Sequence, residues 1–161
     1  MRARSPSVVL VLAAMVSFAG CGSSDEGASS DASSKALTRT ELATKADAIC
    51  QTAKTDALAV DQPKDFATNP KAAATYLTAV QKITRKEQTD LAALTPDDEA
   101  KADYDAMVKS QGALADLLDG VVEKANAEDE SGLQDLARSA ELSKPFVAAA
   151  TKIGAKGCAA G

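Results

Sequence analysis

Cys21, Cys50 and Cys158 are the three cysteines of this chain, and the chain contains no histidine. Thiols can form disulfides, hold metals, carry modifications or attack substrates. A zinc site would need more Cys or His ligands than the chain offers. The lack of His also removes the commonest general base. The thiols are therefore expected to form a bond or carry a modification, and a hydrolase becomes a less favoured class.

The first cysteine follows a short apolar run near the N-terminus. The start is basic, residues 8–20 are apolar, and two small residues, Ala19 and Gly20, directly precede Cys21. The run is too short to cross a bilayer, which takes about 20 residues. This pattern resembles a bacterial lipoprotein signal peptide, with residues 1–20 removed and Cys21 acylated by diacylglycerol, whose two chains give stable anchoring. Ordinary secretion with Cys21 left as a plain thiol is the alternative.

A polar segment separates this cysteine from the rest of the chain. Residues 22–34 contain only Gly, Ser, Ala, Asp and Glu, so they cannot bury enough apolar surface to fold. The sequence predicts a lipidated, disordered tether over residues 21–36 and one folded domain over residues 37–161. The tether could hold the domain clear of the lipid headgroups or be an unselected spacer. The expected location is extracytoplasmic, on the outer face of the cell membrane.

The remaining cysteines, Cys50 and Cys158, can pair in only one way if Cys21 carries lipid. An even number of cysteines in an exported protein is typical of a disulfide. Closing a loop of about 100 residues stabilises a fold by roughly 4.7 kcal/mol in the chain-entropy model. A reactive or metal-binding thiol pair is the alternative, but it lacks further ligands.

Neighbouring carboxylates are plentiful, at residues 97–99, 103/105, 116/119 and 128–130. Acids are favoured near helix starts and on solvated helix faces, and nothing in the pattern indicates a cleft in which two of them converge. A calcium loop starting at Asn126 fails, because its required Gly and Glu positions are not filled by those residues. No catalytic, cofactor or metal site is predicted, and the protein is expected not to be an enzyme.

Glu87 is the one acid that falls on an apolar helical stripe. It could share a buried polar spot with Gln111, or the stripe could rotate so that Glu87 faces water. Charged side chains are rarely buried, which favours the water-facing position. Tyr76, Tyr104, Met107 and Phe146 could likewise line a ligand pocket between helices, although aromatic residues at helical spacing are more often core.

Start and stop signals predict four helices. Thr38 with Glu41 forms a capping box at the start of the first helix. Asn69-Pro70 opens a second helix that reaches about Leu94, and Thr95-Pro96 opens a third. Ser131 is expected to cap the fourth.

The third helix has the most regular pattern of the chain, an apolar seam at alternating steps of four and three residues that only Gln111 interrupts. Gly120 within it could mark the close approach of a neighbour. Pro145 is expected to kink or break the fourth helix, and Gly154 suits its C-terminus.

Composition and connection lengths predict the fold class. Ala dominates the apolar residues, aromatic residues are only 3%, and Ala favours helix over sheet. Four helices with short loops predict an all-α, up-down antiparallel four-helix bundle with one disulfide. In such a bundle the chain end could fold back so that Cys158 reaches Cys50. The net charge of −5 argues against binding nucleic acid or anionic headgroups electrostatically.

Two short motifs carry a resemblance that extends over essentially the whole chain. They are Ala46-Asp47-Ala48-Ile49-Cys50 and the terminal Gly154-x-x-x-Cys158. With the signal peptide, tether and Ala-rich helices, the chain resembles small actinobacterial lipoproteins and secreted helical proteins of unknown function. The resemblance implies a helical envelope protein without an established activity. We expect an envelope protein-interaction module that binds a partner protein through its acidic helical surface. The alternative is a carrier of a small apolar or lipidic ligand between its helices.

Overall fold

The computed structural model describes residues 35–129 and 131–160. Within these ranges the chain is helical, with one isolated bridge and no strand. The predicted signal segment 1–20 and Cys21 lie outside the described residues. The all-α prediction is confirmed for the described part of the chain.

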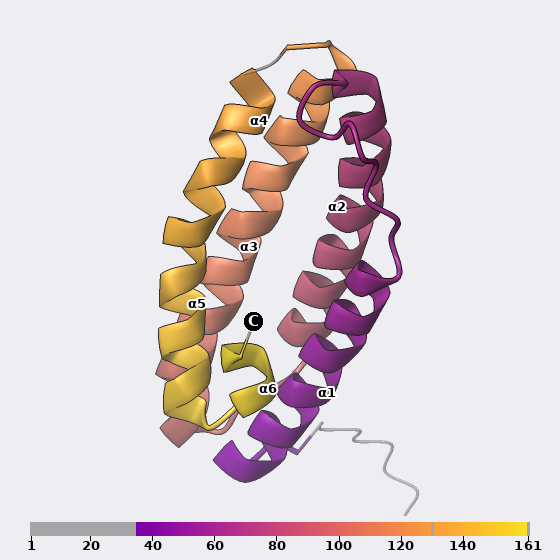
Figure 1. Ribbon diagram of the computed structural model, residues 1–161. Helices are drawn as coiled ribbons and strands as arrows, with labels where there is room; N and C mark the ends of the chain where they lie inside the picture. Colours follow the sequence, from indigo (N-terminus) through magenta and orange to yellow (C-terminus); the bar gives the residue numbers. More distant parts are fainter. Residues whose placement is uncertain (1–34, 130, 161) are drawn as a thin grey trace, which may run out of the picture. The chain divides into compact units, whose positions relative to one another are not determined.

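The helices follow one another along the chain with short connections, except that a longer loop, residues 59–69, joins α1 to α2 (Figure 1). Their bounds are α1 (Arg39–Leu58), α2 (Pro70–Ala92), α3 (Asp98–Asn126), α4 (Ser131–Asp135), α5 (Ser139–Ile153) and α6 (Lys156–Ala159). A 3-10 turn, η1 (Leu136–Arg138), joins α4 to α5. Helix α3 packs extensively against both α2 and α5, whereas α1 packs mainly against α2 and α6 and touches α5 little. The space between α1 and α5 is therefore closed at one end by α6.

Three of the predicted helix ends are present. The side chain of Thr38 accepts a hydrogen bond from the backbone of Glu41, whose carboxylate accepts one from the backbone of Thr38. The side chain of Asn69 caps α2, and Pro70 is its first residue. Gly154 ends α5 with a φ of 87°, a left-handed conformation that favours glycine.

The predicted start of the third helix at Thr95-Pro96 is wrong by two residues. Asp97 is the N-cap of α3 and accepts a hydrogen bond from the backbone of the residue three positions on. Residues 95–97 are held extended by Leu37, whose N–H donates to the carbonyl of Thr95 (2.8 Å) and whose carbonyl accepts from the N–H of Asp97 (2.9 Å). This pairing with the segment before α1 delays the helix.

Pro145 does not break the helix, so that alternative of the prediction is wrong, as is the predicted cap at Ser131. Pro145 lies inside α5, and the regular helix is interrupted earlier, at η1. Pro145 is exposed, so water can satisfy the carbonyl that lacks a partner one turn before it. Ser131 is the first residue of α4, and its N–H donates to the side chain of Asp129 (2.9 Å).

Close approach between helices occurs at Gly132 and not at Gly120. A Cβ on Gly132 would lie 2.8 Å from the Cβ of Lys124 in α3. A Cβ on Gly120 would have no heavy atom within 4 Å. The glycine that permits tight packing in this region is thus the one at the start of α4.

Buried side chains form two separate clusters. The first lies around α6 and is made of Leu42, Ala46, Cys50, Leu91, Ala100, Tyr104, Met107, Ala149, Ala150, Ile153, Ala155 and Cys158. The second lies at the opposite ends of α2 and α3 and is made of Ala73, Ala74, Leu77, Val121, Val122 and Ala125. The middle of the helices belongs to neither cluster.

Candidate functional site

A cavity of about 500 Å³ lies between the helices and is open to solvent. Every long helix and α6 contribute to its wall. Its lining is mostly apolar and consists of Cys50, Ala53, Lys54, Ala57, Leu58, Tyr76, Ile83, Thr84, Glu87, Gln111, Leu114, Ser143, Phe146, Val147, Gly157 and Cys158. Its size falls within the range of small-molecule sites, about 300–1,000 Å³.

Polar side chains of α2 and α3 form part of this wall. Gln111 is 3% exposed and Thr84 is 8% exposed, and both lie among apolar residues. Gln111 Nε2 donates a hydrogen bond to Glu87 Oε2 at 2.5 Å. Gln111 belongs to α3 and Glu87 to α2, and these two helices pack against each other. The hydrogen bond therefore ties the Glu87 carboxylate to α3.

Glu87 is half-buried, so the expectation that it faces water is wrong. Glu87 lies on the inner side of α2, as the apolar residues of its stripe do. The structure contains the alternative, a polar spot that Glu87 shares with Gln111. Burial raises the pKa of the Glu87 carboxyl from its ordinary value of 4.5 to about 7, although the hydrogen bond from Gln111 opposes the shift. A group with this pKa changes its charge near neutral pH.

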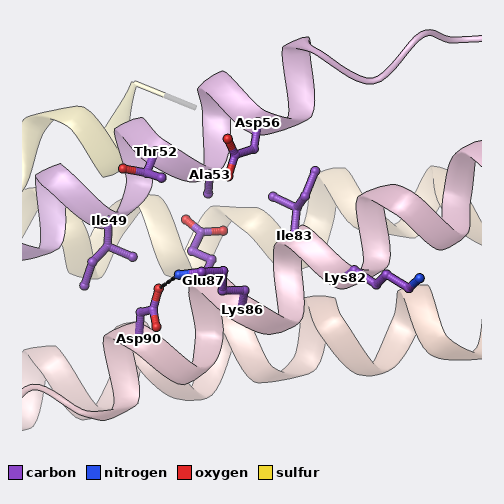
Figure 2. Close-up of a pocket in the computed structure, with 9 residues that line it drawn as sticks. All are labelled: Ile49, Thr52, Ala53, Asp56, Lys82, Ile83, Lys86, Glu87 and Asp90. Carbon is purple, nitrogen blue, oxygen red and sulfur yellow. Dashed lines mark hydrogen bonds and ion pairs between the residues drawn. The ribbon is translucent and has the colours of Figure 1, made fainter.

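A second, smaller hollow of about 200 Å³ lies between α1 and α2. Ala53, Ile83 and Glu87 line both this hollow and the larger cavity. Figure 2 shows the Glu87 carboxylate directed toward Ala53, between the two helices. The carboxylate is therefore accessible from the gap between α1 and α2 as well as from the cavity.

The charged residues of the smaller hollow stand around its edge. Lys86 and Asp90 form an ion pair one turn apart on α2, and Lys82 and Asp56 are both exposed. Glu87 is the half-buried acid beneath them. Glu87 is thus more buried than the acids that the sequence predicts on solvated helix faces are expected to be.

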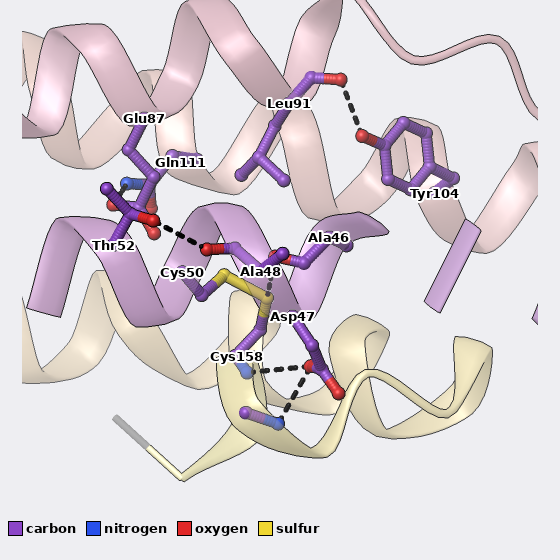
Figure 3. Close-up of a disulfide and its surroundings, with 11 residues drawn as sticks. Ala46, Asp47, Ala48, Cys50, Thr52, Glu87, Leu91, Tyr104, Gln111 and Cys158 are labelled. Atoms are coloured by element: carbon purple, nitrogen blue, oxygen red, sulfur yellow. Dashed lines mark hydrogen bonds between the residues drawn. A yellow bond between two sulfur atoms is a disulfide. The ribbon is translucent and has the colours of Figure 1, made fainter. Parts of the chain in front are cut away.

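The disulfide Cys50–Cys158 forms one end of the cavity and confirms the predicted pairing. Its Cα atoms are 5.2 Å apart, and it closes a sequence separation of 108 residues. Asp47 Oδ1 accepts hydrogen bonds from the N–H groups of Gly157 (2.8 Å) and Cys158 (3.2 Å), as Figure 3 shows. The two motifs that carry the family resemblance thus meet, and their polar residue docks α6 onto α1.

The aromatic candidates divide between core and cavity. Tyr104 and Met107 are buried in the cluster around α6, and the Tyr104 hydroxyl donates to the carbonyl of Leu91. Burial raises the pKa of Tyr104 above its ordinary value. Tyr76 and Phe146 line the cavity instead. Both are half-buried, and Phe146 packs against the cluster around α6 while Tyr76 packs against the second cluster, so they belong to the edge of the core as well as to the cavity wall.

Two groups of lining residues are not among the predicted site residues. The side chains of Ala53 and Ala57 on α1 are small and leave the space that the cavity occupies. Thr84 is a polar residue of α2 on the same wall. A combined count of small residues on α1 and polar residues on α2 at the same level would have indicated an unfilled, partly polar layer.

Several of the other acids, among them Asp116 and Asp119, form ion pairs between helices. Arg85 of α2 bonds to Asp116 and Asp119 of α3, and this contact lowers the pKa of Asp119 and raises that of Arg85. Within residues 35–129 and 131–160, no group of three or more His, Cys, Asp or Glu side chains is arranged to hold a metal ion.

None of the helices in the described part of the chain is long and apolar enough to span a membrane. Comparison of the chain with family profiles, with curated proteins and with solved structures gives no match. The geometry of the cavity therefore carries the functional argument.

Proposed function

We propose that this protein is a carrier that binds a small, largely apolar ligand in the cavity between its helices. The observation that carries the proposal is the cavity itself, about 500 Å³ and mostly apolar, with Thr84, Glu87 and Gln111 on its wall. Small-molecule sites combine an apolar lining with a few polar groups that orient the ligand. In this proposal α1, α2, α3 and the α4–α5 segment act as an up-down antiparallel four-helix bundle that holds the ligand at mid-height.

The alternative of a protein-interaction module has less support. Such a module would present a contiguous apolar patch. Among the described residues, Leu58 is the one large apolar side chain that is strongly exposed, at 78%, and a single side chain does not form such a patch. Leu58 lies on the rim of the cavity, where it can meet a ligand that enters. An envelope protein that receives the ligand remains compatible with the carrier.

We place this carrier outside the cytoplasm, anchored by lipid on Cys21. The basic start, the apolar run and the small residues before Cys21 support the anchor. The Cys50–Cys158 disulfide supports an oxidising compartment, because such bonds persist outside the cytosol. Replacing Cys21 by Ala should release the protein from membranes, and unchanged retention would disprove the anchor.

Binding can be tested with phenylnaphthylamine, a neutral probe that fluoresces in apolar surroundings. The full chain with Cys21→Ser avoids competition from its own lipid. We expect saturable binding that Ala57→Phe weakens at least about tenfold, since the added ring occupies the cavity. Ala48→Phe is the matched control, because Ala48 is exposed on the outer face of α1. Equal binding by both variants, or no saturable binding, would contradict the carrier.

A further inference from the structure

The Glu87 carboxylate has an incomplete set of partners. Its Oε2 accepts from Gln111. No other described residue donates to it, and no described cation forms an ion pair with it. A carboxylate can accept about four hydrogen bonds, so a half-buried one with a single neutral donor is poorly compensated. The cavity exposes it to whatever molecule enters.

Further acceptors lie next to this carboxylate. Thr84 precedes Glu87 by three residues on α2, so their side chains are neighbours on the helix surface. The Thr84 hydroxyl forms no hydrogen bond with any other described residue, and Thr84 lines the same cavity. The amide oxygen of Gln111 is a third acceptor on this wall. A protonated amine has three N–H donors and no acceptor, which matches such a wall.

The charged groups that line the two hollows besides Glu87 are three lysines and two aspartates, and most of them are exposed. Helix α1 contributes Lys54 and Asp56 to the two hollows, and α2 contributes Lys82, Lys86 and Asp90. Lys54, Asp56, Lys82 and Lys86 are exposed, and Lys86 pairs with Asp90. Helices α3, α5 and α6 add no charged side chain to either lining. A cation entering the cavity would meet Glu87 as its nearest buried counter-charge.

We propose that the ligand of this cavity is an organic cation, a protonated amine on an apolar body, whose charge pairs with Glu87. This inference rests on the proposed carrier function and adds the ligand class. An amine supplies both the missing charge and the missing donors, whereas a neutral alcohol supplies one donor and a carboxylate is repelled. The apolar body contacts Tyr76, Phe146 and Leu114 on the remaining wall.

Three probes with the same tail and different heads test the inference: decylamine, decanol and decanoate, each displacing phenylnaphthylamine from the full chain with Cys21→Ser. At pH 8 we expect decylamine to bind about 10- to 100-fold more tightly than decanol, the usual gain of a charge-assisted hydrogen bond. Glu87→Gln should abolish this preference and leave decanol binding intact. Glu123→Gln, a change to an exposed acid of α3 that lines neither hollow, should preserve it.

The pH provides an independent readout. Because burial raises the pKa of Glu87 to about 7, its carboxyl is mostly protonated in the free protein at pH 5. The advantage of decylamine should then fall by about tenfold for each pH unit below 7. If decanol or decanoate binds as tightly as decylamine, or Glu87→Gln keeps the preference, the cation assignment is wrong and the carrier stands. If none of the three displaces the probe, the carrier itself fails.

Discussion

Replacing Glu87 by Gln should make the protein more stable at pH 8 and change its stability much less at pH 5. In the folded protein, burial raises the pKa of this carboxyl to about 7, from an ordinary value of 4.5. The folded state thus binds the proton more tightly than the unfolded chain does. The favourable contribution is complete below about pH 4.5 and is lost as the pH rises through 7. Above that pH the folded protein holds an ionised carboxylate that the unfolded chain would solvate better.

The magnitude follows from the two pKa values. Their difference corresponds to about 3 kcal/mol of destabilisation once the carboxyl is ionised in both states. This is an upper figure, because Glu87 is half-buried and water can reach its free oxygen. Gln removes the charge and keeps an oxygen that can accept from Gln111. We therefore expect Glu87→Gln to raise the free energy of unfolding by about 1–3 kcal/mol at pH 8 and by less than about 1 kcal/mol at pH 5.

The assay is urea unfolding of the full chain, followed by circular dichroism with the disulfide intact, at both pH values. Glu123→Gln is the matched control, since Glu123 is an exposed acid on α3. The control should change stability by no more than about 0.5 kcal/mol at either pH. A Glu87→Gln variant without a larger gain at pH 8 than at pH 5 would refute the burial argument. So would an equal gain in the control.

Four further changes have defined outcomes. Replacing Cys50 and Cys158 together by Ala should lower the free energy of unfolding by about 2–5 kcal/mol in urea titration, and no loss would mean that the long loop adds little entropy to the unfolded chain. Gly120→Ala should raise the free energy of unfolding by up to about 1 kcal/mol, because its added Cβ meets open space, and the thermal midpoint should rise with it. Gly132→Ala should lower that midpoint, because its Cβ would lie 2.8 Å from a side-chain carbon of α3; the opposite order of the two would contradict the packing described here. Asp47→Ala should speed amide hydrogen exchange at the start of α6 and cost about 1–3 kcal/mol, since it removes the acceptor of two N–H groups; unchanged exchange there would contradict its docking role.

Local signals were sufficient to predict three of the helix ends, at Thr38, Asn69-Pro70 and Gly154. The capping box at Thr38 and the Asn69-Pro70 start depend on residues within one turn, so the sequence contains all the information they require. Thr95-Pro96 has an equally good local signal and still fails. Its backbone pairs with Leu37, almost 60 positions earlier, and no local pattern reports that contact. The regular helix is interrupted at η1 and not at Pro145.

The candidate site was predicted in part. The sequence places Glu87 on an apolar stripe and Gln111 in an apolar seam, and it allows both a buried pair and a water-facing acid. Rarity of buried charge favours the second choice, but that rule assumes a filled interior. Here the facing residues of α1 are Ala53 and Ala57, which are too small to occupy the space opposite α2. Glu87 is half-buried because a cavity, and not a packed side chain, lies in front of it.

The position of the disulfide follows from this cavity. The helices around a cavity of about 500 Å³ lack the van der Waals contacts and the buried apolar surface that would otherwise hold them together there. Helix α1 touches α5 little, and its inner attachment to the C-terminal part of the chain is α6. The Cys50–Cys158 bond and the Asp47 hydrogen bonds fix that attachment at the edge of the cavity. The covalent tie thus reinforces the packing of α1, whose Leu42 and Ala46 are buried in the cluster around α6. Reduction should loosen the cavity wall before it unfolds the packed cluster at the far ends of α2 and α3.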